Sequence, residues 1–162
     1  MLNKINIKES VNLYRNHINH KEHSVDDYIN LILLLWNVSF DYGFESYCIA
    51  QNVFTQEEIL KFPEDTKKLF NDAFQEYPNN NELLFWKIYT DDLSAYSEGV
   101  HKEDICDLLN GDNFLLPYFY FYVQCENLNT KRLSELKRSL INEKDSYKKY
   151  YILSYLSDIN LT

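Results

Sequence analysis

The sequence predicts an all-α fold, formed by a single helical domain over residues 1–162. Apolar residues recur at three- and four-residue spacing along nearly all of the chain, and the strict alternation typical of strands is almost absent. The chain has only 3 glycines and 3 prolines, which suits helices joined by short turns better than sheets with long loops. We therefore expect about eight or nine helices packed as antiparallel hairpins, in an irregular bundle or a short repeat-like array.

The first half of the chain is expected to form helices over residues 5–20, 24–40 and 63–77, with a shorter helix between a turn at 41–43 and residue 53. Ser24 is a suitable N-cap, and two aspartates follow it at the positive end of the helix dipole. The helix that Ser24 begins is apolar over a wide arc and should be the most buried one. Thr55 and Glu58 match a capping box, and Pro63 should break or kink the helical pattern at its position.

The second half is expected to form helices over residues 82–98, 102–110, 116–126, 131–141 and 145–156. Thr130 would cap the fourth of these, Asp145 would begin the last, and Gly99 suits a left-handed helix C-terminus. Helical periodicity places one apolar stripe of the helix over 82–98 toward the core, formed by Phe85, Trp86, Tyr89, Leu93 and Tyr96.

One short segment resembles a known repeat family. Residues 73–83 read Ala-Phe-Gln-Glu-Tyr-Pro-Asn-Asn-Asn-Glu-Leu, with Pro78 after an aromatic helix end and Glu82 opening the next helix. This pattern resembles the junction between tetratricopeptide repeats, which implies stacked helical hairpins. The chain has no second copy of the junction and lacks the glycine of the family's first helix. We therefore expect neither a regular repeat array nor the peptide-carboxylate clamp of that family.

Cysteine usage and hydropathy predict a cytoplasmic protein. Cys48, Cys106 and Cys125 are odd in number and widely spaced, so three reduced thiols in or near a core are expected rather than disulfides or a zinc knuckle. The N-terminus lacks the apolar region of a signal peptide. The most apolar run, residues 29–36, is far shorter than the roughly 18 residues that a membrane span needs.

Sequence motifs for catalysis are missing, and we expect no enzymatic activity, no cofactor and no metal. The chain has no phosphate-binding glycine loop, zinc-protease, nucleophile-elbow or EF-hand motif. The spacing of His17 and His20 allows both to share a helix face and bind a metal ion, but His23 lies in the following turn and further ligands are not obvious. Solvated polar residues at a helix end are the interpretation we prefer.

For two groups of aromatic residues, the sequence does not decide whether the side chains are buried or exposed. Residues 118–122 are five aromatics in a row, and successive residues on a helix turn by about 100°, so they cannot all face one core. We favour a wall between two helical layers, and the alternative is that Tyr118 or Tyr122 reaches the surface as a binding hot spot. The C-terminal tyrosines repeat the ambiguity: Tyr147, Tyr150, Tyr151 and Tyr155.

The negative charge of the chain is concentrated in its middle third. Residues 57–112 carry 14 acidic and five basic side chains, a net charge of −9, and the rest of the chain sums to zero. Residues 91–112 hold seven of these acids and one base, Lys102. Residues 131–149 are locally basic but interleaved with acids, so we interpret them as the solvated faces of two helices.

An acidic surface of this kind has two interpretations. It either keeps the protein soluble or steers a cationic partner, with tyrosines at its margin supplying short-range binding. Either way it argues against nucleic acid as a partner, because phosphates would be repelled. The residues predicted to bind a partner belong to the helices over 82–98 and 102–110: Asp91, Asp92, Glu98, Glu103, Asp104, Asp107, Tyr89 and Tyr96.

The size, acidic charge, helical make-up and AT-rich residue usage of the chain resemble those of small bacterial immunity proteins. These accompany secreted or contact-dependent toxins. The resemblance implies a cytoplasmic inhibitor that covers the nucleic-acid site of a basic nuclease toxin. The six carboxylates would stand in for phosphates, and Tyr89 and Tyr96 would anchor the partner. The sequence leaves the oligomeric state open.

Two other functions remain open. A helical-hairpin scaffold would bind a peptide or partner protein in a concave groove, with the Pro78 junction as its signature. A small enzyme with an unrecognised carboxylate pair would show strongly perturbed carboxyl pKa values inside a deep pocket.

Overall fold

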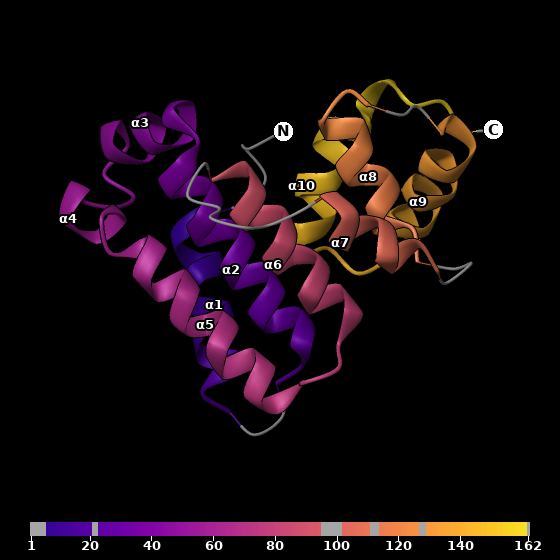
Figure 1. The fold of residues 1–162 in the computed structure, drawn as a ribbon. Coiled ribbons are helices and arrows are strands. Elements are labelled where there is room, and N and C mark those ends of the chain that lie inside the picture. The colour runs from indigo at the N-terminus through magenta and orange to yellow at the C-terminus, as the bar shows by residue number, and fades with distance from the viewer. Residues whose placement is uncertain (1–5, 21–22, 95–101, 111–113, 127–128, 162) are drawn as a thin grey trace. The chain divides into compact units, whose positions relative to one another are not determined.

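The computed structural model describes residues 6–20, 23–94, 102–110, 114–126 and 129–161 (Figure 1). Within these ranges the chain forms helices and turns and no strand, so the predicted all-α fold is confirmed. The α-helices, in chain order, are α1 (Ile7–Ile18), α2 (Val25–Phe40), α3 (Tyr42–Ala50), α4 (Gln56–Ile59), α5 (Phe62–Glu76), α6 (Asn81–Leu93), α7 (Lys102–Asp107), α8 (Leu116–Val123), α9 (Thr130–Asn142) and α10 (Tyr147–Tyr155). Two 3₁₀ turns, η2 (Leu108–Asn110) and η3 (Leu156–Asp158), follow α7 and α10.

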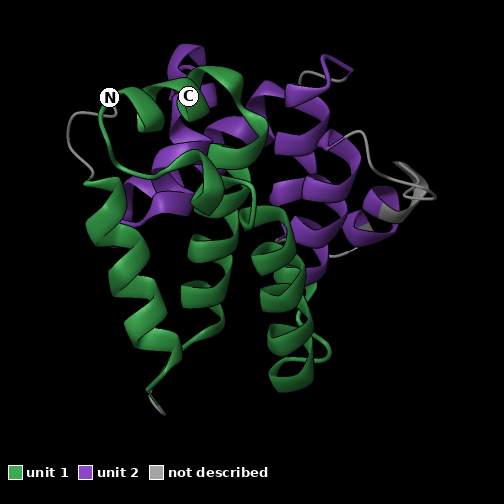
Figure 2. Cartoon of the chain, turned by 90° about the vertical axis from the view of Figure 1, so that its left-hand side faces the viewer, with its two compact units in different colours: residues 1–83 green, residues 84–162 purple. Residues whose placement is uncertain are grey.

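The chain divides into two compact units, residues 1–83 and residues 84–162 (Figure 2). The division falls inside α6, three residues after this helix begins at Asn81. The expectation of one domain over residues 1–162 stays a prediction.

Helix α2 forms the centre of unit 1. It packs against α1, α3 and α5, and its residues 28–36 and Val38 are buried. Apolar side chains on every side explain this burial, and among the described helices α2 has the most buried residues, as the sequence predicts. The predicted N-cap at Ser24 is also confirmed, because its backbone N–H donates to Asp27 Oδ2 at 2.9 Å in a capping box.

Helices α3 and α4 lie at the end of unit 1 where α2 ends (Figure 1). The predicted turn at 41–43 is the beginning of α3, because Asp41 Oδ1 accepts hydrogen bonds from the backbone N–H groups of Gly43 and Phe44. The capping box of α4 is confirmed: Thr55 N–H donates to Glu58 Oε2 at 2.7 Å, and Glu58 N–H donates to Thr55 Oγ1.

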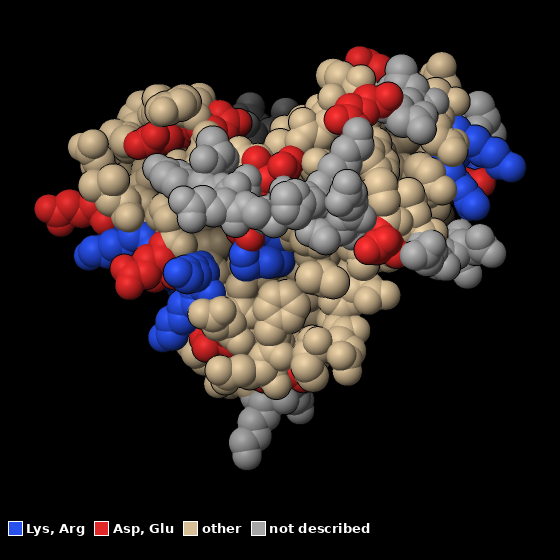
Figure 3. Space-filling view, viewed as in Figure 1, with Lys and Arg blue, Asp and Glu red and all other residues tan. Residues whose placement is uncertain are grey.

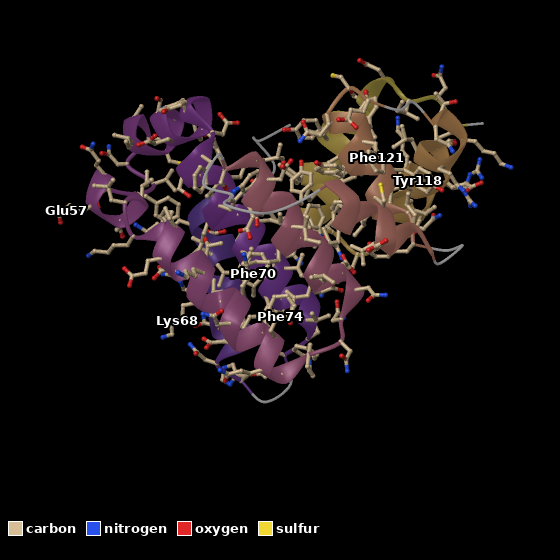
Figure 4. All side chains as sticks on the ribbon, in the orientation of Figure 1. Glu57, Lys68, Phe70, Phe74, Tyr118 and Phe121 are labelled. Atoms are coloured by element: carbon tan, nitrogen blue, oxygen red, sulfur yellow. The ribbon has the colours of Figure 1, made fainter. Side chains whose placement is uncertain are left out.

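The junction between α5 and α6 forms as its sequence predicts. Helix α5 ends at Glu76, α6 begins at Asn81, and Asn80 Oδ1 accepts a hydrogen bond from Leu83 N–H at 2.8 Å. Pro63 lies in the first turn of α5, where its missing N–H needs no partner, so it does not kink the helix. Figure 4 shows Phe70 and Phe74 on the inner side of α5 and Lys68 on the outer side.

Aromatic rings fill the core of unit 2. Tyr89 stacks on Phe119 with ring centroids 5.7 Å apart, and Trp86 meets Tyr89 edge to face at 5.2 Å. Tyr151 of α10 packs on the same rings, and its hydroxyl lies 2.8 Å from that of Tyr89. Offset and edge-to-face pairs of this kind add stability beyond the area that they bury.

Two helix starts in unit 2 differ from the predictions by a residue. Asn129 rather than Thr130 caps α9, because its Oδ1 accepts from Arg132 N–H, and Ser146 rather than Asp145 caps α10. The predicted helix end at Gly99 lies outside the described residues. Among the helices that the structure describes, none combines the length and apolar composition needed to cross a lipid bilayer.

Candidate partner-binding surface

The predicted acidic surface is only partly visible in the structure. Asp91 and Asp92 lie on α6, and Asp107 is exposed on α7. Glu103 and Asp104 are residues of α7, but only their backbone belongs to the described part of the structure. Glu98 and Tyr96 lie outside the described residues altogether.

Asp91 is locally neutralised. Its carboxylate forms an ion pair with Lys87, one turn earlier on α6. The two side chains are both about one-third exposed, where such pairs contribute little to stability. The pair nevertheless cancels much of the field that Asp91 would exert on a partner.

The side chain of Asp92 is oriented by hydrogen bonds from two neutral side chains of the same unit. Its Oδ2 accepts hydrogen bonds from the Tyr120 hydroxyl at 3.0 Å and from Gln124 Nε2 at 2.7 Å, both on or next to α8. Burial and the Asp92 charge raise the pKa of Tyr120 to about 12, so this donor is neutral at physiological pH. Two neutral donors leave the negative charge of Asp92 uncancelled.

Tyr89 is not a surface anchor, which corrects the sequence-based prediction. Its side chain is wholly buried among Trp86, Phe119 and Tyr151, and burial raises the pKa of its hydroxyl far above the ordinary range. Helical periodicity placed this ring toward the core, which is confirmed, but it could not show that the whole ring is covered.

The five successive aromatics of α8 divide between core and margin. Phe119, Tyr120 and Phe121 are buried, whereas Tyr118 and Tyr122 are half-buried. The guanidinium of Arg132 lies 5.9 Å from the centroid of the Tyr118 ring, a cation–π distance (Tyr118 is labelled in Figure 4). This arrangement fits the favoured wall interpretation for three of the rings.

His17 and His23 of unit 1 are each hydrogen-bonded to a carboxylate rather than arranged for a metal. His17 Nδ1 lies 2.7 Å from Asp27 Oδ1, and His23 Nε2 lies 2.5 Å from Glu76 Oε2. His23 Nδ1 also lies 2.6 Å from the backbone oxygen of His20. In the described residues no group of three or more His, Cys, Asp or Glu is placed to hold a metal ion.

The geometry of His23 favours the protonated ring. Both ring nitrogens face oxygen atoms, the backbone oxygen of His20 and the carboxylate of Glu76, and only the imidazolium form donates to both. The backbone oxygen of His20 and the carboxylate of Glu76 accordingly raise the pKa of His23 above 6.5. These contacts connect the turn before α2 to the end of α5.

The basic segment over residues 131–149 is not simply a pair of solvated faces. Lys148 and Lys149 are buried, which corrects the prediction for these two side chains. The Lys149 ammonium donates to the backbone oxygens of Ile141 and Glu143, at the C-terminal end of α9. Two of the positive charges expected at the surface are therefore withdrawn from it; Figure 3 shows basic side chains that remain exposed over α9.

Sequence reasoning missed a second acidic region, at α3 and α4. Residues 41–60 carry four acidic side chains and no lysine or arginine: Asp41, Glu45, Glu57 and Glu58. Figure 3 shows acidic side chains spread over these two helices. The same segment exposes Tyr42 and Leu60, which are 85% and 73% accessible to solvent. The sequence shows that this segment has no lysine or arginine, but it does not show that the apolar side chains point outward.

No protein-family model, no curated protein sequence and no solved structure matches this chain. The function therefore has to be inferred from the side chains and their geometry.

Proposed function

We propose that the protein is a binding protein that neutralises a basic partner, as an immunity protein neutralises a nuclease toxin. The observation that carries the proposal is the state of the described carboxylates on α6 and α7. Asp92 is oriented by neutral donors, Asp107 is exposed, and neither forms an ion pair with a described basic side chain. Such charges act on an approaching cation at the distances that accelerate association.

The net charge of the chain supports the same proposal. At −9, it favours encounter with a basic protein and opposes encounter with nucleic acid. In this proposal the carboxylates of α7 contact the site where the toxin binds phosphates. Asp92, which precedes them on α6, is held in place by hydrogen bonds from Tyr120 and Gln124.

Association kinetics at several salt concentrations test the proposal. The proposal expects the partner to be a basic toxin domain encoded beside this chain's own gene, and the readout includes inhibition of the nuclease activity of that domain. We expect Glu103→Lys/Asp107→Lys to slow association at least about tenfold at low salt and to flatten its salt dependence. Asp91 is left unchanged because its reversal would break the ion pair with Lys87.

A matched control separates local charge from total charge. Glu9→Lys/Glu64→Lys carries the same net charge, −5, but changes α1 and α5 instead. We expect this control to keep most of the association rate. Equal slowing in both variants, or a toxin that remains active with the wild-type chain bound, would contradict the proposal.

A helical-hairpin scaffold is the second candidate function, and the α5–α6 junction favours it. Helix α5 ends before residues 77–80 and α6 begins after them, with Asn80 accepting from Leu83 N–H, as the resemblance to a repeat junction predicts. A scaffold would retain an extended peptide segment of its partner. An inhibitor would bind only the folded toxin domain, so a binding assay against both forms discriminates the two.

A further inference from the structure

Exposed apolar side chains gather at α3 and α4 more than elsewhere in the described structure. Nine large hydrophobic side chains are exposed in the described residues, and four of them lie within residues 42–60: Tyr42, Tyr47, Ile49 and Leu60. The two most exposed of the nine, Tyr42 and Leu60, are both in this segment. Single exposed apolar residues are ordinary, but a group of them marks a surface that contacts something.

The outer face of α3 is set by the residues that α3 buries. Phe44 and Cys48 point into unit 1 and are buried. Because successive residues turn by about 100°, Tyr42 and Ile49 share a side of the helix that faces away from Phe44 and Cys48. Both are exposed, and the half-buried Glu45 lies at the edge between this side and the buried one.

Helix α4 presents a similar combination. Phe54, Ile59 and Phe62 are buried, and the rings of Phe54 and Phe62 meet edge to face at 5.1 Å. This packing fixes the short helix and leaves Leu60 and Glu57 outside; Figure 4 shows Glu57 projecting beyond α4. The exposed groups thus stand on backbone that is anchored from within.

The carboxylates of this region are not balanced by ion pairs. No described basic side chain pairs with the four acids of residues 41–60, although Arg15 of α1 pairs with Asp65 nearby in unit 1. Asp41 and Glu58 accept hydrogen bonds only from neutral backbone and hydroxyl groups. Lys8 and Arg15 of α1 act on Glu58 and help to lower its pKa, but neither forms an ion pair with it. Since residues 41–60 carry four acids and no lysine or arginine, positive charge on a partner that covers this region is favourable.

We propose that α3 and α4 form a docking surface for a basic protein segment whose lysines or arginines surround apolar side chains. We call this the α3–α4 surface, made of Tyr42, Glu45, Ile49, Glu57 and Leu60. The apolar members contact the centre of the partner, and the carboxylates pair with the cations around it. The inference rests on the proposed function for the charge of the partner and adds where on unit 1 that partner is held.

A defined peptide tests this surface without knowledge of the natural partner. The probe is a labelled amphipathic peptide of leucine and lysine, and its control carries the same lysines with serine in place of leucine. We expect the full chain to bind the leucine peptide more tightly than the serine peptide, as measured by fluorescence anisotropy at low salt. Equal binding of the two peptides would overturn the apolar half of the inference.

Paired variants locate the binding. Tyr42→Ser/Leu60→Ser should weaken binding of the leucine peptide at least about tenfold, because hot-spot side chains are removed. The matched control Leu13→Ser/Ile141→Ser removes apolar side chains of 50% and 47% exposure elsewhere, and should change binding less than about twofold. All four positions are exposed, so circular dichroism and the melting temperature should confirm that each variant stays folded. An equal effect of both pairs would overturn the location.

The charged members are tested separately. Glu45→Gln/Glu57→Gln should reduce the salt dependence of peptide binding, whereas Glu9→Gln/Glu64→Gln should not. Asp41 and Glu58 are left intact because their carboxylates cap α3 and α4. Carbodiimide cross-linking should join peptide lysines to Glu45 and Glu57; cross-links spread evenly over the chain would overturn the inference.

A second copy of this chain is the rival occupant. The lysines of α5 and its N-cap, Lys61, Lys67 and Lys68, are exposed and could meet the α3–α4 surface of another molecule. Analytical ultracentrifugation decides this: a dimer that Tyr42→Ser/Leu60→Ser dissociates, with no peptide binding, would overturn a basic partner as the occupant. If the peptide binds here but no toxin is neutralised, the surface stands and the proposed function fails. If Tyr42→Ser/Leu60→Ser and Leu13→Ser/Ile141→Ser neutralise the toxin equally well, the proposed function stands and the α3–α4 surface fails.

Discussion

At the scale of single residues, the clearest effect of structure on chemistry is the pairing of His23 with Glu76. The pKa of His23 is raised and the pKa of Glu76 is lowered, each chiefly by hydrogen bonds to the charged form. The carboxylate also accepts a hydrogen bond from the Tyr28 hydroxyl at 3.0 Å. This cluster connects the turn before α2 to the end of α5, two segments far apart in sequence.

The signs of these shifts predict a pH window. The stability from His23 is fully present below its unfolded pKa of 6.5 and is lost as the pH rises through the higher folded value. The stability from Glu76 is present above pH 4.5 and is lost as the pH falls through the lower folded value. Glu76→Gln should therefore lower the free energy of unfolding most between these limits, by up to about 1 kcal/mol because the carboxylate is exposed.

Chemical denaturation at pH 6 and pH 9 measures this effect, at pH values chosen from the ordinary range of histidine. The difference between wild type and Glu76→Gln should shrink at the higher pH. His20→Gln, which removes an exposed imidazole of the same turn, should lower the free energy of unfolding at pH 6 less than Glu76→Gln does. An equal loss of unfolding free energy at both pH values would mean that Glu76 stabilises the fold through its hydrogen bond with Tyr28 instead.

The three thiols should differ in reactivity, which corrects the expectation that all lie in or near a core. Cys48 is buried, and burial raises its pKa to about 11, whereas Cys106 and Cys125 are exposed. Because the thiolate is the reactive form, iodoacetamide at pH 8 should modify the two exposed thiols about 100-fold faster than Cys48. Mass spectrometry of the labelled native protein measures the rates, and denatured protein, in which all three should react alike, is the control. Similar rates in the native protein would contradict this burial.

At the scale of elements, the C-terminal end of α9 depends on a lysine from α10. The ammonium of Lys149 lies 2.7 Å from the Glu143 oxygen, 3.3 Å from the Ile141 oxygen and 3.2 Å from Asp145 Oδ1. A cation at the negative end of a helix is favourable, and here it also satisfies carbonyl groups that the helix leaves open. These three oxygen partners explain why a buried lysine is tolerated.

Lys149→Met should destabilise the protein by about 1–2 kcal/mol, because it keeps an unbranched apolar stem but removes the charged donor. The change in the free energy of unfolding is measured in urea. Lys144→Met, at an exposed position just before α10, should change it by less than about 0.5 kcal/mol. A loss no larger than that of the control would show that the carbonyl contacts contribute nothing.

At the scale of the whole molecule, the boundary between the two units lies inside a helix. Residues on both sides of position 83 belong to α6, and neither unit can lose its part of this helix without breaking hydrogen bonds of the other part. We therefore expect one cooperative unfolding transition rather than two.

The two tryptophans allow a direct measurement, because Trp36 is buried in unit 1 and Trp86 in unit 2. Trp86→Phe leaves Trp36 as the reporter of unit 1, and Trp36→Phe leaves Trp86 as the reporter of unit 2. In each variant, fluorescence and far-ultraviolet circular dichroism should give the same urea midpoint. A fluorescence midpoint that separates from the circular dichroism midpoint would show two independently unfolding domains.

Much of the fold could be predicted from sequence because its signals are local. The spacing of apolar residues identified the helices, and short-range pairs such as Thr55 and Glu58 located a helix start correctly. The long apolar arc of α2 identified the centre of unit 1. Such features depend on residues within one or two turns of each other.

The candidate surfaces depended on contacts that no local pattern contains. Asp92 meets Tyr120 and Gln124 from another helix, and Tyr89 is covered by rings from α8 and α10. Periodicity gives the direction of a side chain from its own helix, but burial depends on what packs against that side. The sequence alone therefore determined the helices and the negative charge, because both depend on local composition and spacing. The tertiary structure decided which carboxylates have a cationic partner and which apolar side chains stay exposed, because both depend on what packs against them.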